Sequence, residues 1–228
     1  MKLLLTNDDG IEAEGLQALL NAAREIGEPW LIAPANQQSG CSHTVTTHRG
    51  FRVERRDDRS FAVHGTPADC VRVGLLRILP DAAWILSGIN HGGNLGADVH
   101  YSGTVAAIRE GVLHGWPGIA LSHYHQKGSD FDWQRAARLV LPILRDLIQS
   151  VPEPGTFLNI NLPHLSENEL DPEVVFCPLD PTPLPLSFRH QADEFLYDGD
   201  YFSRRRKPGC DVDVCFGGRI AVTKIRLF

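Results

Sequence analysis

The sequence predicts an α/β fold with a doubly wound, mostly parallel sheet and a β-rich C-terminal extension or hairpin arm. Short apolar runs alternate with segments of helical spacing as far as about residue 162, and several of these runs end in polar, glycine-rich turns. Strands that alternate with helices form parallel sheets with right-handed crossovers. With 228 residues, 43% of them hydrophobic, the chain is long enough to bury the core of one such domain.

The first 64 residues predict a β-α-β unit followed by short strands. Lys2 to Thr6 is an apolar run closed by a polar turn, and apolar residues then recur at helical spacing from Leu16 to Ala23. Gly27 is a stop signal for that helix, and Trp30 to Ala33 is a second buried strand. Three further short strands are expected at 44–47, 51–55 and 60–64.

The alternation continues from residue 66 to residue 162. Thr66 is the expected N-cap of a helix over 67–79, because it precedes Pro67 and a segment of helical spacing. The other helices are expected at 105–113 and 133–148, and the other strands at 84–86, 118–122 and 157–162. The strand at 84–86 is expected to end in a long glycine-rich turn, 87–104.

The C-terminal part has a different character. Residues 177–186 hold four prolines, which exclude a helix or a central strand there. We interpret 178–210 as an extended excursion or hairpin arm, and expect a terminal strand at 220–227. The predicted division is therefore an α/β core at 1–163 and an extension at 164–228, which is either part of the same domain or an oligomerisation element.

Charge and composition exclude several classes of protein. With 22 basic and 28 acidic side chains the net charge is −6, which argues against a protein that coats nucleic acid or an anionic membrane. No apolar run approaches the ~20 residues of a membrane span, and the N-terminus does not resemble a signal peptide. Five scattered cysteines suit free thiols in a reducing compartment, so a cytoplasmic location is expected.

Two adjacent carboxylates carry the strongest chemical signal. Asp8 and Asp9 follow the first strand, and Ser39 and Asn90 lie in turns after two other strands. Turns at the carboxyl ends of parallel strands gather at one edge of the sheet. Oxygen ligands of this kind suit a hard cation such as Mg²⁺ or Mn²⁺. The alternative, favoured on the two acids alone, is that Asp8 or Asp9 caps a helix near Ile11, or that 7–10 is simply a turn.

A second polar segment predicts an anion site. Ser102, Gly103 and Thr104 precede the helix at 105–113, where free N–H groups and hydroxyls favour phosphate, although plain N-capping is the alternative. His43 is a candidate acid or substrate contact, or an ordinary loop histidine, and His91 has the same standing.

Other candidates are weaker. His123 and His125 could ligate a metal, but nothing else in the sequence supports it. Cys210 and Cys215 could hold a metal with a histidine, but their spacing is not that of a zinc ribbon. The basic run 204–207 is interpreted as a solvated loop. The minor alternative is that it binds a polyanionic substrate. Phosphatase-type cysteine and serine nucleophile motifs are absent from the sequence.

Four motifs in order and spacing resemble the SurE family of stationary-phase survival proteins. They are TNDDG at 6–10, the Ser39-Gly40 loop, GTPADCV at 65–71, and SGIN with NLG and YSGTVAA at 87–107. The resemblance runs from residue 1 to about 163. It implies a Rossmann-like core and one divalent metal ion per subunit, bound by Asp8, Asp9, Ser39 and Asn90. Phosphate contacts would come from Ser102, Gly103 and Thr104, with Asn94 and His43 nearby.

The resemblance also implies an activity and an assembly. Members of the family are metal-dependent phosphatases of nucleoside 5′- and 3′-monophosphates, some also of short polyphosphate, and they form dimers or tetramers through an exchanged C-terminal extension. We therefore predict hydrolysis by a metal-activated water, with Asp8 and Asp9 as catalytic residues. Two alternatives remain open. One is a phosphatase with an aspartyl-phosphate at Asp8, and the other is a nucleotide-binding sensor without turnover.

Overall fold

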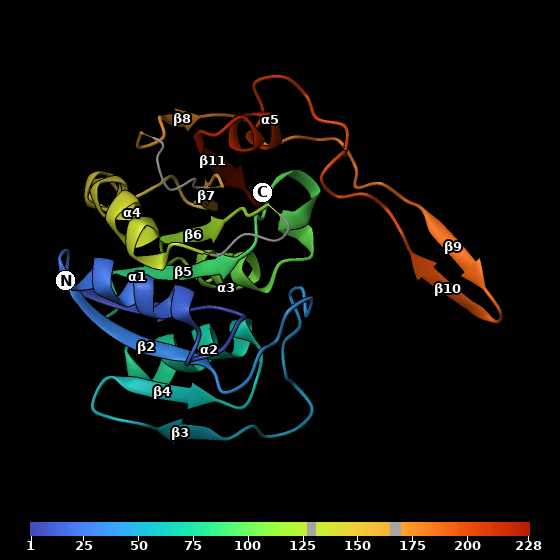
Figure 1. Cartoon of the computed structure of the whole chain (residues 1–228). Coiled ribbons are helices and arrows are strands. Elements are labelled where there is room, and N and C mark those ends of the chain that lie inside the picture. Colours follow the sequence, from blue (N-terminus) through green and yellow to red (C-terminus); the bar gives the residue numbers. More distant parts are fainter. Residues whose placement is uncertain (127–130, 165–169) are drawn as a thin grey trace.

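The computed structural model describes residues 1–126, 131–164 and 170–228 and shows one nine-stranded sheet with helices on both faces (Figure 1). The strand order is β3-β4-β2-β1-β5-β6-β7-β11-β8. All pairs between β4 and β7 are parallel, whereas β3 pairs antiparallel with β4 and β11 antiparallel with β7. The strands are β1 (Lys2–Thr6), β2 (Glu28–Pro34), β3 (Val53–Arg55), β4 (Ser60–Val63), β5 (Trp84–His91), β6 (Gly118–His123), β7 (Thr156–Leu162), β8 (Val174–Phe176) and β11 (Ile220–Arg226). The predicted α/β fold is confirmed.

Helices cover the sheet in two layers. On one face lie α1 (Glu14–Arg24) and α4 (Trp133–Leu147), and on the other lie α2 (Pro67–Val73) and α3 (Gly103–Leu113). The predicted helix over 67–79 is present, but its second half is the π-helical turn η1 (Gly74–Ile78). Thr66 caps α2 as expected, because its hydroxyl accepts from the N–H of Asp69 at 3.2 Å.

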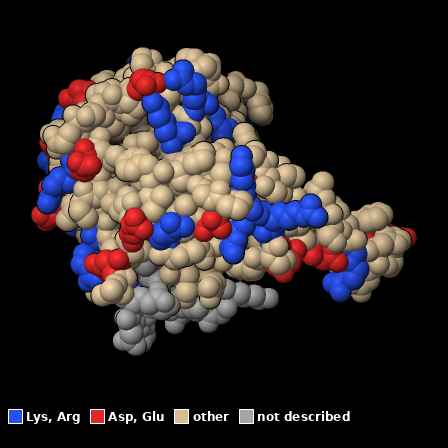
Figure 2. Space-filling view, turned by 90° about the horizontal axis from the view of Figure 1, so that it is seen from above, with Lys and Arg blue, Asp and Glu red and all other residues tan. Residues whose placement is uncertain are grey.

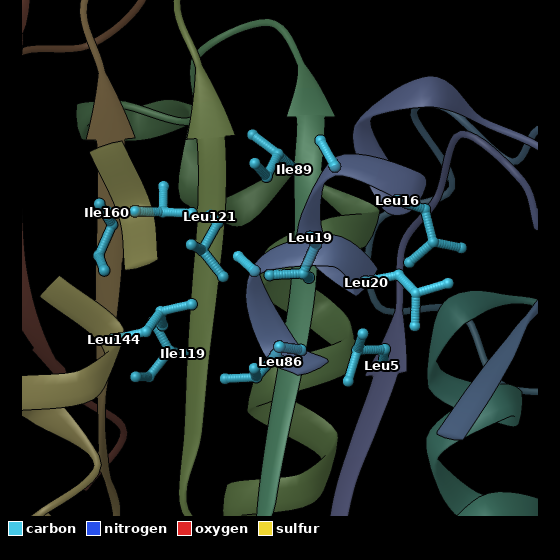
Figure 3. Close-up of a cluster of buried hydrophobic side chains, with 14 of the residues drawn as sticks. Leu5, Leu16, Leu19, Leu20, Leu86, Ile89, Ile119, Leu121, Leu144 and Ile160 are labelled. Atoms are coloured by element: carbon cyan, nitrogen blue, oxygen red, sulfur yellow. The ribbon is translucent and has the colours of Figure 1, made fainter. Parts of the chain in front are cut away.

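The two layers explain why the strands are apolar throughout. In β1 the side chains of Leu3 and Leu5 join the core under α1 and α4, while Leu4 joins the core under α2 and α3. All three are fully buried, and a buried leucine contributes about 1.5–3 kcal/mol. Figure 3 shows the first of these cores, where Leu19 of α1 lies over the leucines and isoleucines of β1, β5 and β6.

The structure corrects three of the expected elements. Residues 44–47 form no strand, because Thr46 is bonded through its N–H and its hydroxyl to the carboxylate of Asp69 instead of to a neighbouring strand. Strand β5 runs on to His91, through a register shift between Ser87 and Asn90, so the predicted end at Leu86 is wrong. A helix, α5 (Asp211–Phe216), was not expected, because six residues are too few to show a helical period.

The C-terminal extension contributes both to the sheet and to an arm. Strand β11 confirms the expected terminal strand, and β8 adds the edge next to it. Residues 177–186 have no regular structure, as their prolines required. The arm is a two-stranded hairpin, β9 (Phe188–Gln191) and β10 (Glu194–Tyr197), which projects away from the body in Figures 1 and 2. In the described part of the chain, no helix has the length and apolar character needed to cross a membrane.

Candidate active site

The three polar turns predicted to meet do lie together, around one cavity at the carboxyl ends of β1, β2 and β5. The cavity has a volume of about 650 Å³. Strand β1 is hydrogen-bonded to both β2 and β5, so the residues that follow these strands emerge side by side. Its described lining is Asp8, Asp9, Ala13, Glu14, Gly15, Gln37, Ser39, Gly40, Asn90, His91, Asn94, Asp98, Tyr101, Ser102, Trp133 and Leu184.

The turn after β1 presents the two acids and is closed by Asn7. The Asn7 side chain donates to the carbonyl of Gly10 at 2.9 Å and accepts from its N–H at 3.2 Å. Helix α1 begins only at Glu14, and no side chain caps it. The alternative in which Asp8 or Asp9 caps that helix is therefore wrong, and both carboxylates are available for other chemistry. Sequence patterns did not indicate these two bonds of Asn7, which is completely buried.

Asp8 is enclosed by the start of helix α3. The hydroxyl of Thr104 donates a short hydrogen bond to Asp8 Oδ1, and a Cβ atom at Gly103 would lie 2.7 Å from the Cβ of Asp8. Only glycine therefore fits there. Burial raises the pKa of Asp8 to about 6; the negative charge of Asp9 also raises it, and the bond from Thr104 opposes the rise.

Asp9 is more exposed and contacts strand β5. Its Oδ2 atom accepts from the N–H of His91 at 3.1 Å. Burial raises the pKa of Asp9 as well, against the lowering effect of this hydrogen bond. The close approach of β5 to β6 depends on Gly88, whose φ is +136° and where a Cβ would lie 2.2 Å from the carbonyl oxygen of Leu121. Glycine at 88 thus places Asn90 and His91 beside the acids.

The other two predicted ligands also face the cavity. Ser39 is exposed, and its Oγ accepts from Gln37 Nε2 at 2.8 Å. Asn90 donates through Nδ2 to the carbonyl of Gly92 at 2.8 Å. This bond uses the donor end of the amide, so the acceptor end, Oδ1, is the atom suited to a cation.

The donor set fits a hard divalent cation. Among the described lining residues there are four carboxylates and no Lys or Arg, so no lysine or arginine there compensates Asp8 and Asp9, and His91 is the basic side chain beside them. Two carboxylates, a hydroxyl and an amide are all oxygen donors. Within the described residues no three His, Cys, Asp or Glu side chains cluster as a metal site, which gives no support to ligation by Cys210 with Cys215 or by His123 with His125.

The predicted phosphate contacts divide into two groups. Asn94 and Ser102 line the cavity, whereas Gly103 and Thr104 lie against Asp8, which is itself part of the lining. Ser102 is also the N-cap of α3, since its Oγ accepts from the N–H of Val105 at 3.1 Å. His43 is not in the described lining. Its Nε2 atom lies 2.7 Å from the carboxylate of buried Glu110.

Asn94 is held rigidly by polar side chains of β6 and β7. It donates through Nδ2 to Ser122 Oγ at 2.8 Å, and its N–H donates to Asn161 Oδ1 at 2.8 Å. Its carbonyl accepts from Asn159 at 2.8 Å and from Asn161 at 3.1 Å. These partners lie 28 to 67 residues along the chain, and nothing in the sequence pattern linked them to the site.

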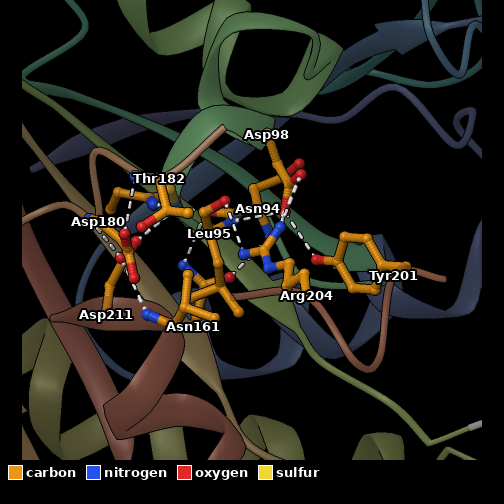
Figure 4. Close-up of polar contacts among 12 residues, drawn as sticks. Asn94, Leu95, Asp98, Asn161, Asp180, Thr182, Tyr201, Arg204 and Asp211 are labelled. Carbon is orange, nitrogen blue, oxygen red and sulfur yellow. Dashed lines mark hydrogen bonds and ion pairs between the residues drawn. The ribbon is translucent and has the colours of Figure 1, made fainter. Parts of the chain in front are cut away.

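The basic run 204–207 is not wholly a solvated loop, which corrects the sequence interpretation. Arg204 is buried, and its guanidinium donates to both carboxylate oxygens of Asp98, at 3.1 and 3.2 Å, and to the carbonyl of Leu95 at 3.1 Å. Tyr201 donates to the same carboxylate at 2.7 Å. Figure 4 shows these bonds joining the C-terminal extension to the segment that carries Asn94. Within the basic run 204–207, the exposed residues are 205–207.

Comparisons with known proteins agree on one family. The profile described as "Survival protein SurE" matches residues 3–180. A protein of a Nostoc species is 49% identical over the full length of both chains. The "5'-nucleotidase SurE" of Methylorubrum populi is 36% identical over 100% of this chain and 93% of its own. The crystal structure of the SurE protein from Aquifex aeolicus matches with a TM-score of 0.88 at 28% identity, covering 100% of this chain and 94% of that one. The chain therefore belongs to the SurE family of survival proteins.

Proposed function

We propose that this chain is a divalent-metal-dependent 5′-nucleotidase. The observation that carries the proposal is the cavity itself, in which Asp8 and Asp9 lie beside Ser39 and Asn90 with no Lys or Arg among the described lining. Relatives named "5'-nucleotidase SurE", such as that of Methylorubrum populi, support the same assignment. The family resemblance extends the proposal to 3′-monophosphates and to short polyphosphate, which an open cavity of about 650 Å³ has room to admit.

The residues take different parts in this proposal. Asp8, Asp9, Ser39 and Asn90 would hold one Mg²⁺ or Mn²⁺ ion per chain. When bound, such an ion acts as a Lewis acid on phosphate and lowers the pKa of water. Asn94 lines the cavity beside these four residues, and its side-chain amide would donate a hydrogen bond to the phosphate.

Within the pair of acids, Asp9 is better placed to accept the proton of the attacking water. Both acids line the cavity, but Asp8 is only 5% exposed and accepts the hydrogen bond of Thr104, whereas Asp9 is half-buried. The hydroxyl of Ser102 also lines the cavity and donates to a phosphate oxygen in our proposal. The enclosure of Asp8 disfavours the aspartyl-phosphate alternative, because a nucleophile needs an open approach to phosphorus.

The test compares Asp8→Asn and Asp9→Asn with the wild type. Each substitution removes a charged ligand at nearly constant shape, so we expect loss of metal-dependent phosphate release from adenosine 5′-monophosphate with an unchanged circular dichroism spectrum. Asp193→Asn, on the exposed turn of the arm, is the matched control and should keep full activity. Wild-type turnover by either site variant at saturating Mn²⁺ contradicts the proposal. Nucleotide binding without turnover by the wild type identifies a sensor.

We also propose a homodimer or homotetramer in which the arm contacts another subunit. In the single chain Phe188 is 58%, Phe195 71% and Tyr197 52% exposed. An isolated two-stranded hairpin is marginally stable in water. Exchange of an identical element between subunits buries such side chains in a symmetric assembly. A cytoplasmic location belongs to the same proposal, on the basis of the five free cysteines.

A further inference from the structure

A group of three rings, His91, Phe131 and Trp133, lies beside the acids, and we call it the aromatic wall. The rings of Phe131 and Trp133 stack at 4.8 Å with an angle of 6° between their planes. The ring of His91 lies 4.1 Å from that of Phe131 and 6.3 Å from that of Trp133. His91 and Trp133 both line the cavity that holds Asp8 and Asp9. Stacked rings such as Phe131 and Trp133 are usually core packing, but here Trp133 and the neighbouring His91 reach the lining of the site.

The wall is fixed in position before any ligand arrives. Trp133 Nε1 donates to Glu14 Oε2 at 3.0 Å, which joins the start of α4 to the start of α1. The far edge of the indole packs on Gly15, where a Cβ atom would lie 3.0 Å from two ring carbons. Asp132 caps α4 by accepting from the N–H of Arg135 at 2.8 Å. A ring held on several sides loses little conformational entropy when a ligand stacks on it.

The wall directly adjoins the acidic side of the cavity. The N–H of His91 donates to Asp9 Oδ2 at 3.1 Å, so the same residue contacts a predicted metal ligand and contributes a ring to the wall. The described lining has no Lys or Arg. Apart from hydrogen bonds to Glu14 and Asp98, which also line the cavity, binding of the rest of the ligand therefore comes from apolar and neutral polar contacts. Flat aromatic ligands are bound in this way by stacking on aromatic side chains.

We propose that the aromatic wall is the subsite for the base of the nucleotide, with Trp133 as its main stacking surface. This inference rests on the proposed nucleotidase function and assigns specificity-determining residues to it. Stacking accepts every base because every base has a π-face, and it is strongest for the larger purines. The wall therefore favours nucleotides over phosphate esters without a base, and purine nucleotides over pyrimidine ones.

Tyr101 is the other aromatic residue in the described lining, and it is a weaker candidate. Its side chain is 61% exposed, and among the described residues no ring contact holds it. Ordering an exposed side chain costs about 0.5–1.5 kcal/mol on binding. Trp133 has already lost that freedom through Glu14, Gly15 and Phe131. We therefore assign the base to the wall and treat stacking on Tyr101 as the competing outcome.

The first test measures steady-state kinetics of Trp133→Leu with adenosine 5′-monophosphate and with ribose 5-phosphate, which lacks a base. Loss of a stacking ring should raise KM for the nucleotide by about 5- to 150-fold, with little change in kcat. The kinetics of ribose 5-phosphate hydrolysis should stay the same. The matched control is Trp30→Leu, because Trp30 also stacks on a phenylalanine, Phe61, and its indole also donates to a glutamate, but it does not line the cavity. It should leave both substrates unaffected.

Two further measurements make every outcome decisive. His91→Ala alters an exposed side chain, so it should fold even if Trp133→Leu does not, and it should raise KM for the nucleotide more than for ribose 5-phosphate. Calorimetry of adenosine binding to metal-free protein tests the wall without turnover, and Trp133→Leu should bind more weakly than the wild type.

Failure of the wall and failure of the nucleotidase function give different results. If the wild type hydrolyses neither substrate, the proposed function fails, while adenosine binding still tests the wall. The assignment of the base to the wall is refuted if wild type, Trp133→Leu and His91→Ala have equal KM for the nucleotide and equal affinity for adenosine. A selective rise of KM in Tyr101→Leu, without one in Trp133→Leu, places the base on Tyr101 and also overturns it.

Discussion

Replacing Arg204 by methionine should destabilise the protein far more than an ordinary surface substitution. The Arg204 side chain is 3% exposed and its partner Asp98 is 12% exposed, so the pair is shielded from water. Methionine keeps much of the volume that packs on the ring of Tyr201, 4.6 Å from the guanidinium carbon, but removes the charge. Asp98 would then stay buried without its cation, at a cost of about 3–5 kcal/mol.

Urea denaturation measures this loss directly, as the difference in the free energy of unfolding between variant and wild type. For a chain of this size the same loss lowers Tm by roughly 6–20 °C. Arg205→Met is the matched control, because Arg205 is exposed, and it should change the free energy of unfolding by less than about 0.5 kcal/mol.

A double-mutant cycle with Asp98→Asn separates the pair from the packing. If the two side chains act together, the double variant should lose much less stability than the sum of the two single variants. A loss below about 1 kcal/mol in Arg204→Met is what an exposed ion pair gives, and it would refute the reasoning that this pair anchors the extension. Because Asp98 lines the cavity, kcat/KM for the nucleotide should fall as well.

Three other variants test the site and the assembly. Gly103→Ala places a Cβ 2.7 Å from that of Asp8, so kcat/KM should fall on the order of 100-fold, whereas Gly50→Ala, with open space around it, should be neutral in the same assay. Asn90→Ala removes a neutral ligand, so calorimetry should show weaker Mn²⁺ binding and excess Mn²⁺ should restore turnover; unchanged metal affinity makes Asn90 a turn residue only. Deleting 188–197 should convert an oligomer into monomers by light scattering without loss of secondary structure, since the N–H of Asp198 already bonds the carbonyl of Ser187 at 3.0 Å. A wild type that is already monomeric at micromolar concentration contradicts the role of the arm.

Most of the helices and strands could be predicted from local sequence patterns. The apolar run of β1 and the spacing of α1 are properties of a few neighbouring residues, so the sequence predicts them directly. The gathering of Asp8, Ser39 and Asn90 followed from one topological rule about the carboxyl ends of parallel strands. These predictions succeed because the physical cause lies within each segment or in the order of the segments.

Predictions that depend on distant contacts could not be made in the same way. Arg204 meets Asp98 across 106 residues, and in sequence it belongs to a basic run typical of solvated loops. Thr104 was assigned to phosphate because a helix N-terminus attracts anions, and the sequence pattern did not indicate that its hydroxyl also bonds Asp8, 96 residues away. Residues 178–210 were interpreted as an extended excursion or hairpin arm, but Tyr201 and Arg204 are anchored in the body, which leaves the hairpin 188–197 as the projecting part.

Metal-dependent turnover is the most direct test of the central claim. Purified protein is stripped with EDTA, and phosphate release from adenosine 5′-monophosphate is measured during titration with Mn²⁺, while calorimetry counts the ions bound per chain. We predict no release without metal, full activity at one ion per chain, and neither binding nor release in Asp9→Asn. Phosphate release that persists in EDTA, or a wild-type chain that binds no divalent ion at this site, would contradict it.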